Sequence, residues 1–294
     1  MKPFLMCELT TSDGLRHQGI YAEPVVKKKK AVLWMHGLSA AFYNDYELYE
    51  IIADALIDNG YGFAIFNNRG HDLIAGIRKY DGTPPNGYTY YPGGAGSEVF
   101  EECVFDINAG IDFLVEKGFS EIILVGHSTG ANKVCYYAAS QKNSYVIGVV
   151  LSGAMSDRLG HPEPEESRNE HILDMKQKIA EGKSDELFFG YHFFPITPKR
   201  YLSLFEPGSS EDTFDYGDVN PKMKSFSHIQ FPLLVLLGGA DEYADRPVEQ
   251  IAKVFDEHAT STHYKSIIIP DALHKFHGKE SEVAAVLVEF INAL

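Results

Sequence analysis

Cysteine, positive charge and long apolar runs are all scarce in this chain of 294 residues. Its three cysteines, Cys7, Cys103 and Cys135, are widely scattered, so they form neither a disulfide framework nor a metal-knuckle spacing. No apolar run approaches the roughly 20 residues of a membrane-spanning helix, and the apolar stretch after Lys2 is too short for the core of a signal peptide. These absences predict a protein with no membrane span and a cytoplasmic location.

The deficit of positive charge excludes one large class of partners. Only 26 Lys and Arg residues accompany 41 Asp and Glu residues, which gives a formal net charge of -15. A field of that sign repels phosphate backbones and anionic lipid headgroups, so no nucleic-acid partner is expected. The one basic run, residues 27–30, precedes an apolar segment and is expected to be a solvated turn.

Short apolar runs alternate with segments of helical periodicity along most of the chain. This pattern indicates an α/β fold with a mostly parallel central sheet and helices on both faces. The expected strands are residues 31–35, 62–66, 122–125, 146–151, 233–237 and 266–269. The expected helices are residues 46–59, 98–117, 132–140, 247–258 and 280–293. An antiparallel hairpin of residues 4–10 and 17–23 is expected at one edge of the sheet.

Two segments interrupt this alternation. Residues 67–97 hold three prolines and seven glycines without clear periodicity, and we expect so long a connection to lie near the functional site. Residues 156–228 are richer in charge and proline, and are predicted to be a cap inserted into a core of residues 1–155 and 229–294. The aromatic residues of this cap segment either form its own core or line a cavity; they are Phe188, Phe189, Tyr191, Phe193, Phe194, Tyr201 and Phe205.

The motif that carries chemistry is Gly-His-Ser-Thr-Gly at residues 126–130, which joins an expected strand to an expected helix. A tight strand-to-helix turn needs glycine on each side of the serine, where a Cβ would clash, and it leaves the serine projecting above the sheet. A serine hydroxyl is a weak nucleophile, so it needs an imidazole to remove its proton and a carboxylate to orient that imidazole. This context predicts Ser128 as a nucleophile.

The same stretch resembles the nucleophile elbow of the α/β-hydrolase superfamily, and the strand and helix order resembles that fold along the whole chain. His36-Gly37 is similar to the superfamily's oxyanion loop, and Asn-Arg-Gly-His at 68–71 to the signature after its next strand. Ser-Asp-Arg at 156–158 and Asp-Glu-Tyr at 241–243 resemble a fungal and plant subgroup that includes siderophore ester hydrolases. The resemblance implies an α/β-hydrolase fold with an inserted cap.

The resemblance also implies the partners of the serine. Gly-x-x-Asp at residues 238–241 matches the superfamily's acid turn, which assigns the acid to Asp241, and the histidine after the last strand is His274. His277 competes with His274 but lies further from that strand. Asp245 competes with Asp241, yet it stands just before Arg-Pro at 246–247 and is expected to cap or border the next helix.

Two main-chain groups complete the expected site. By the family pattern, the N–H groups of Leu38 and Thr129 form the oxyanion hole, which stabilises negative charge developing on the substrate. Arg69, His71 and Asp106 are expected to fix loop and helix geometry. The sequence contains neither a His-Glu-x-x-His motif nor a Gly-x-x-x-x-Gly-Lys loop, so no metal and no cofactor are expected.

These observations predict a serine carboxylic ester hydrolase with a Ser-His-Asp triad, an acyl-enzyme intermediate and a small-molecule ester as its substrate. Two alternatives stay open. The same residues would serve a thioesterase or an amide hydrolase, because nothing in the triad distinguishes these bonds. A non-catalytic ligand-binding protein on a hydrolase fold is a further alternative, and the joint presence of serine, histidine, acid and the His36-Gly37 loop argues against it.

Overall fold

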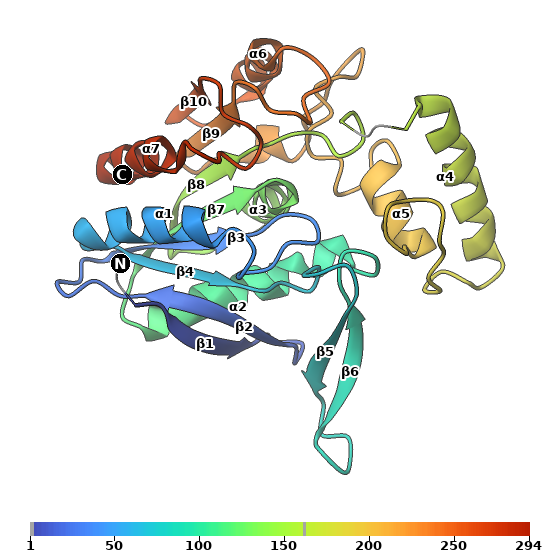
Figure 1. The fold of residues 1–294 in the computed structure, drawn as a ribbon, viewed down its shortest axis with the longest axis horizontal. Helices are drawn as coiled ribbons and strands as arrows, with labels where there is room; N and C mark the ends of the chain where they lie inside the picture. Colours follow the sequence, from blue (N-terminus) through green and yellow to red (C-terminus); the bar gives the residue numbers. More distant parts are fainter. Residues whose placement is uncertain (1–2, 161–162) are drawn as a thin grey trace.

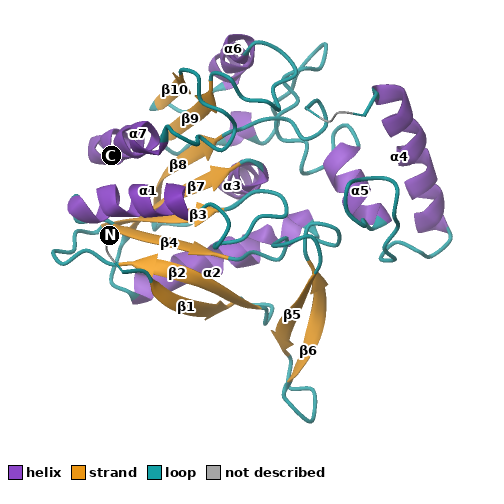
Figure 2. Cartoon of the chain, in the orientation of Figure 1, coloured by secondary structure: helices purple, strands orange, loops and turns teal. Residues whose placement is uncertain are grey.

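The structure is a computed structural model of this chain and describes residues 3–160 and 163–294. Its centre is an 8-stranded sheet in the order β1-β2-β4-β3-β7-β8-β9-β10 (Figures 1 and 2). Neighbouring strands from β4 onward in that order are parallel. Strands β1 and β2 form an antiparallel hairpin at one edge of the sheet, as the sequence predicts. Strand β2 also pairs antiparallel with β4.

The elements follow the predicted alternation closely. The strands of the large sheet are β1 (Leu5–Thr10), β2 (Arg16–Ala22), β3 (Lys30–Met35), β4 (Gly62–Phe66), β7 (Glu121–His127), β8 (Val146–Ser152), β9 (Leu233–Gly238) and β10 (Tyr264–Ile269). The helices of the core are α1 (Tyr46–Asp58), α2 (Cys103–Glu116), α3 (Thr129–Ser140), α6 (Val248–His258) and α7 (Glu280–Ala293), with short 3₁₀ turns η1 (Phe100–Glu102) and η2 (Phe226–His228).

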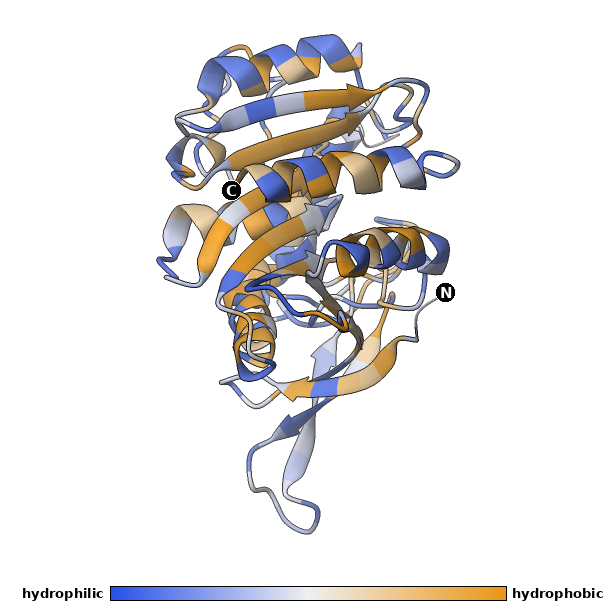
Figure 3. Cartoon of the chain, turned by 90° about the vertical axis from the view of Figure 1, so that its left-hand side faces the viewer, coloured by the Kyte–Doolittle hydropathy of each residue, from blue (hydrophilic) through white to orange (hydrophobic). Residues whose placement is uncertain are grey.

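Two hydrophobic layers hold the helices against the sheet. Side chains alternate across a strand, so Val32 and Trp34 of β3 face the layer of α1 and α7, whereas Leu33 and Met35 face the layer of α2, α3 and α6. The central strands are accordingly apolar along most of their length (Figure 3). Within the described residues, no helix is long and apolar enough to cross a membrane.

Residues 67–97 contain regular structure that the sequence pattern did not predict. They contain a two-stranded antiparallel sheet, β5 (Ala75–Tyr80) and β6 (Tyr88–Gly93), which projects away from the large sheet (Figures 1 and 3). The hairpin is largely hydrophilic because most of it is not packed on the core. The ends of the segment do contact the functional region: Asn68 bonds to the loop after β3, and Gly96 accepts a hydrogen bond from Thr197.

The predicted cap segment contains two helices that stand beside the sheet, α4 (Glu165–Ala180) and α5 (Pro198–Phe205) (Figure 1). They share a small hydrophobic cluster that includes Ile172, Met175 and Leu204. Later in the segment, Phe214 and Phe226 pack in the core of the sheet layer instead. This packing argues for a cap that ends earlier than residue 228. Residues 161–162 of the segment lie outside the described residues.

Candidate active site

Ser128 occupies a sharp turn between β7 and α3. Its φ and ψ angles are 57° and -130°, in the left-handed half of the map, where side chains other than glycine are strained. A Cβ on Gly126 would lie 2.2 Å from the carbonyl oxygen of Gly130, and a Cβ on Gly130 would lie 2.2 Å from that of Met35. Both glycines are therefore required by close backbone contact, and the turn leaves the Ser128 side chain in a cavity.

The loop after β3 lies directly against this serine. A Cβ on Gly37 would lie 2.7 Å from the Cβ of Ser128, so only glycine allows the two backbones to approach this closely. The buried His36 ring holds the loop: Nδ1–H donates to the Gly37 carbonyl at 3.0 Å, and Nε2 accepts from the Asn68 N–H at 3.2 Å. Burial lowers the pKa of His36 to about 3, which keeps the ring neutral and preserves this bonding pattern.

Both predicted oxyanion donors flank Ser128. Leu38 lines the cavity, and within the described residues its N–H donates to no other group. Thr129 is the first residue of α3, where a helix leaves its N–H without an intrahelical partner. The positive end of the α3 dipole lies at this N-terminus, beside Ser128. This arrangement of free N–H groups at a helix start favours an anion or a developing negative charge.

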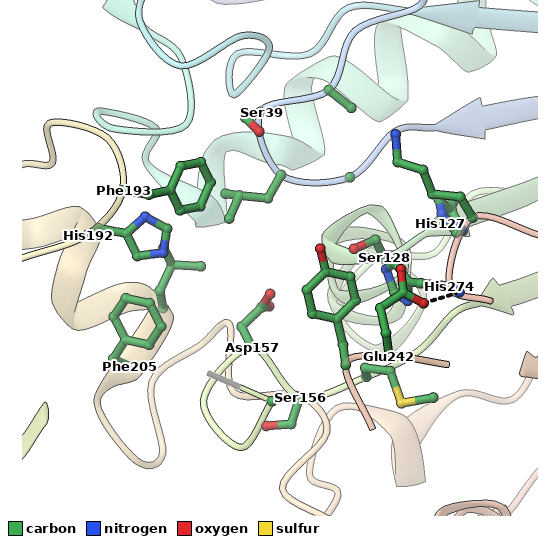
Figure 4. Close-up of a pocket in the computed structure, with 18 of the residues that line it drawn as sticks. Ser39, His127, Ser128, Ser156, Asp157, His192, Phe193, Phe205, Glu242 and His274 are labelled. Carbon is green, nitrogen blue, oxygen red and sulfur yellow. Dashed lines mark hydrogen bonds between the residues drawn. The ribbon is translucent and has the colours of Figure 1, made fainter. Parts of the chain in front are cut away.

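His274 and Asp241 form a hydrogen-bonded pair at the carboxyl edge of the sheet. His274 Nδ1–H donates to Asp241 Oδ2 at 2.8 Å, and the Tyr243 N–H donates to Asp241 Oδ1 at 2.9 Å. Both members of the pair are 6% exposed. With Nδ1 committed to the carboxylate, Nε2 of His274 is the nitrogen left to act as a base. Figure 4 shows the His274 ring beside Ser128.

The two competing residues lie elsewhere. Asp245 pairs with its neighbour Arg246 at 2.7 Å, so it neither reaches His274 nor caps α6. The His277 side chain is 56% exposed and lies 3.9 Å from Glu280. Neither residue lines the cavity that contains Ser128.

Three residues that the sequence did not predict as part of the site surround His274. Glu242 Oε2 accepts the His274 N–H at 2.8 Å, which fixes the loop that carries the imidazole (Figure 4). The Tyr243 ring meets the His274 ring edge-on, with centroids 4.8 Å apart. The His127 ring lies 5.1 Å from it between centroids. Glu242 and Tyr243 directly follow Asp241, so their position in the sequence was the available signal.

His127 is a buried and uncharged neighbour. Burial, and after it the charges of His274 and Lys275, lowers the pKa of His127 well below its usual range. A neutral His127 does not repel a positive charge formed on His274 during proton transfer. Gly153 makes room for both rings, because a Cβ there would lie 3.1 Å from His127 and 3.2 Å from His274.

The cavity has a volume of about 1010 Å³ and lies outside the carboxyl ends of β3, β7, β8, β9 and β10. Ligands of open α/β sheets bind at this edge. The far wall comes from the predicted cap segment and includes Tyr191, His192, Phe193, Leu204 and Phe205. Residues 67–97 adjoin the site through the bond of Asn68 to His36, although none of the described residues of that segment forms part of the cavity wall.

Arg69 and Asp106 have the structural role predicted for them. Arg69 is fully buried and donates to Asp106 at 2.9 Å, which ties the loop after β4 to α2. His17 of β2 also contacts Asp106, at 3.2 Å. His71 lies 3.0 Å from Asp72 in the same loop, away from the cavity. Among the described residues, no group of three or more His, Cys, Asp or Glu side chains could hold a metal ion.

Comparison with known proteins agrees with the geometry of the sheet and the elbow. The chain has the α/β-hydrolase fold, shared along nearly its full length with solved esterases and hydrolases. Residues 89–294 match the family described as "Protein of unknown function (DUF1749)", and the chain belongs to that family. Comparison with curated proteins gives no match.

Three of the solved structures illustrate the likeness. A thermostable carboxyl esterase from Bacillus coagulans has a TM-score of 0.65 and 16% identity, over 100% of this chain and 99% of that one. Siderophore hydrolase EstB from Aspergillus fumigatus has a TM-score of 0.65 and 16% identity, over 100% and 98%. Est1E from Butyrivibrio proteoclasticus, solved with ferulic acid, has a TM-score of 0.65 and 14% identity, over 97% and 98%. Because the sequence identities are this low, the structural likeness establishes a shared fold and nothing more specific.

Proposed function

We propose that this protein is a serine ester hydrolase with Ser128 as nucleophile, His274 as base and Asp241 as the acid that orients it. The observation that carries the proposal is a strained serine at a helix start, in one cavity with a histidine whose Nδ1–H donates to a buried carboxylate. The esterases among proteins of the same fold support the bond class.

The proposed reaction proceeds in two steps. Ser128 Oγ attacks the acyl carbon while His274 Nε2 takes the hydroxyl proton, and the N–H groups of Leu38 and Thr129 bind the oxyanion. His274 then returns the proton to the leaving alcohol as the C–O bond breaks. Water attacks the resulting acyl-enzyme by the same route in reverse, releasing the acid and restoring Ser128. Asp241 stabilises the imidazolium throughout.

A fluorophosphonate probe tests the proposal directly, because it reacts only with an activated serine hydroxyl. We expect covalent labelling of the peptide that contains Ser128, with loss of fluoride from the probe. Ser39 and Ser156 line the same cavity and are internal controls that should stay unlabelled. Heat-denatured protein is the negative control. An unlabelled native protein, or a label on Ser39 or Ser156, would contradict the assignment.

A screen of p-nitrophenyl esters of increasing acyl length, with a matched thioester and anilide, then assigns the bond. We expect the oxygen ester to be hydrolysed with the highest kcat/KM. Faster turnover of the thioester or of the anilide would instead assign the protein to one of the alternative classes that use the same residues.

The cap aromatics should separate into two groups under mutation. Tyr201 is fully buried in the hydrophobic cluster of α4 and α5 and does not line the cavity. We therefore expect it to make no contact with the substrate. Phe193 is 76% exposed and lines the cavity. We expect Phe193→Ala to change acyl-length preference with little loss of stability. Tyr201→Ala should lower the free energy of unfolding by about 3 kcal/mol. Thermal unfolding and the ester series measure both, and reversed effects would contradict this division.

A further inference from the structure

A buried network of charges lies behind the cavity. Lys133 of α3 pairs with Glu98, and Arg200 of α5 lies 3.2 Å from the same carboxylate. Arg200 also pairs with Glu211. The side chains of these four residues are at most 1% exposed. Two cations therefore face two carboxylates, and the network is electrically balanced without any further acid.

Asp157 is a further carboxyl group at the edge of this network, and it lines the cavity. Among the described residues, Asn132 Nδ2 donates a hydrogen bond to Asp157 Oδ2 at 3.4 Å. Within the described part of the chain, no Lys, Arg or His nitrogen lies close enough to pair with it. The adjacent Arg158 is already shared between Asp212 at 3.3 Å and Asp218 at 2.8 Å. Among the described residues, therefore, no cation forms an ion pair with Asp157.

The other carboxylates of the cavity have partners. Asp45 accepts from Lys275 at 2.9 Å, Glu242 accepts the His274 N–H, and Glu163 lies 3.3 Å from His171. In the view of Figure 4, the Asp157 carboxyl lies between the cap side chains Phe193 and Phe205 on one side and Ser128 on the other. Among the described carboxylates of this cavity, Asp157 and Glu242 form no ion pair, and Glu242 is engaged by the main chain of the His274 loop.

We propose that Asp157 is a specificity-determining residue that binds an ammonium group of the substrate, so that the preferred esters carry a primary amine. The proposal rests on the proposed function and assigns its substrate class. A carboxylate and an ammonium form a charge-assisted hydrogen bond, which is stronger than a neutral one. The net charge of -15 favours a cation over an anion as well.

The surroundings of Asp157 couple this binding to a proton. Burial, and after it the charge of Glu211, raises the pKa of Asp157 to about 8, while Arg200 and Lys133 act in the opposite direction. Asp212 also raises it. At pH 7 the free carboxyl is therefore largely protonated. An ammonium group favours the ionised form, so binding below about pH 8 releases a proton from Asp157.

Two isosteric esters test the proposal, methyl 6-aminohexanoate and methyl heptanoate, which differ by an ammonium in place of a methyl group. Hydrolysis is followed by pH-stat near pH 8.5, above the pKa of Asp157 and below that of an alkylammonium, about 10.4 for lysine. We expect the native protein to prefer the ammonium ester by at least about tenfold in kcat/KM. In Asp157→Asn this preference should fall to within about twofold, with turnover of the neutral ester retained.

Glu163→Gln is the matched control, because it removes one negative charge from the same cavity at a carboxylate that already has His171 beside it. We expect this variant to keep most of the preference. Equal kcat/KM for the two esters in the native protein, or an equal loss of preference in both variants, would overturn the specific role of Asp157.

Binding to Ser128→Ala separates this inference from the proposed function. Calorimetry with hexylammonium chloride, using 1-hexanol as the neutral control, should show binding that disappears when Asp157→Asn is added. At pH 7, buffers of different ionisation heat should reveal the released proton. Asp157-dependent binding without ester hydrolysis would refute the hydrolase and retain the ammonium site. Ester hydrolysis without such binding or preference would refute the site and retain the hydrolase.

Discussion

Replacing Ser128 with alanine should lower ester turnover by about 10⁴-fold or more while the protein remains folded. The change deletes the hydroxyl that attacks the substrate and leaves the backbone of the elbow as it is. The Ser128 side chain accepts no capping hydrogen bond from the helix that follows it, so little stability is lost with its oxygen. Turnover of the best p-nitrophenyl ester measures the effect, with circular dichroism and thermal unfolding as the folding control.

Ser156→Ala is a suitable partner variant. Ser156 lines the same cavity, and its Oγ accepts the Leu159 N–H at 3.3 Å, which is a local turn contact. We expect this variant to keep nearly full turnover. Native-like activity in Ser128→Ala, or a comparable loss in Ser156→Ala, would end the assignment of Ser128 as the nucleophile.

The second large effect should come from Asp241→Asn, with turnover reduced by about 10³- to 10⁴-fold and folding preserved. An amide cannot stabilise the imidazolium, and its N–H₂ group favours the wrong tautomer of His274. The nearby Glu242 does not replace the lost carboxylate, because its oxygen is engaged by the His274 main-chain N–H at 2.8 Å. Steady-state kinetics on one ester are sufficient to measure the loss.

Asp245→Asn is the matched control for this variant. Its carboxylate pairs with Arg246, at the surface of the same loop, and removing that charge should leave turnover within about twofold of native. The pair of variants therefore tests the choice between the two acids that the sequence alone left open. A large loss at Asp245 with little change at Asp241 would reverse it.

The sequence was sufficient to predict the sheet because its buried strands are continuous apolar runs, such as residues 233–237, which end at glycine. The positions of Ser128 and His274 followed from motifs at strand ends, since parallel strands bring their carboxyl ends to one edge. The hairpin β5–β6 escaped prediction because neither of its faces is a large apolar surface, so no hydrophobic alternation marks its strands.

The cap and the second layer of the site depended on contacts between distant residues. Tyr201 and Phe193 have the same aromatic character in the sequence, yet one is fully buried and the other is exposed at the cavity. Asp157 is likewise an ordinary aspartate until the pairing of Arg200, Lys133 and Arg158 with other acids leaves it without a cation. Sequence spacing contains no information about such competition between partners.

The ion network through Arg200 also determines how the cap can move. Arg200 belongs to α5, but its side chain is bonded to the Ala95 carbonyl at 3.0 Å and lies beside Glu98, both on the core side. Swinging α5 away would separate Arg200 from Glu98 and from the Ala95 carbonyl, although Glu98 would keep Lys133 and Arg200 would keep Glu211. These contacts tie α5 to the core and oppose a hinged movement of the predicted cap segment. Any widening of the cavity on this side would first have to break the contacts of Arg200 with the core.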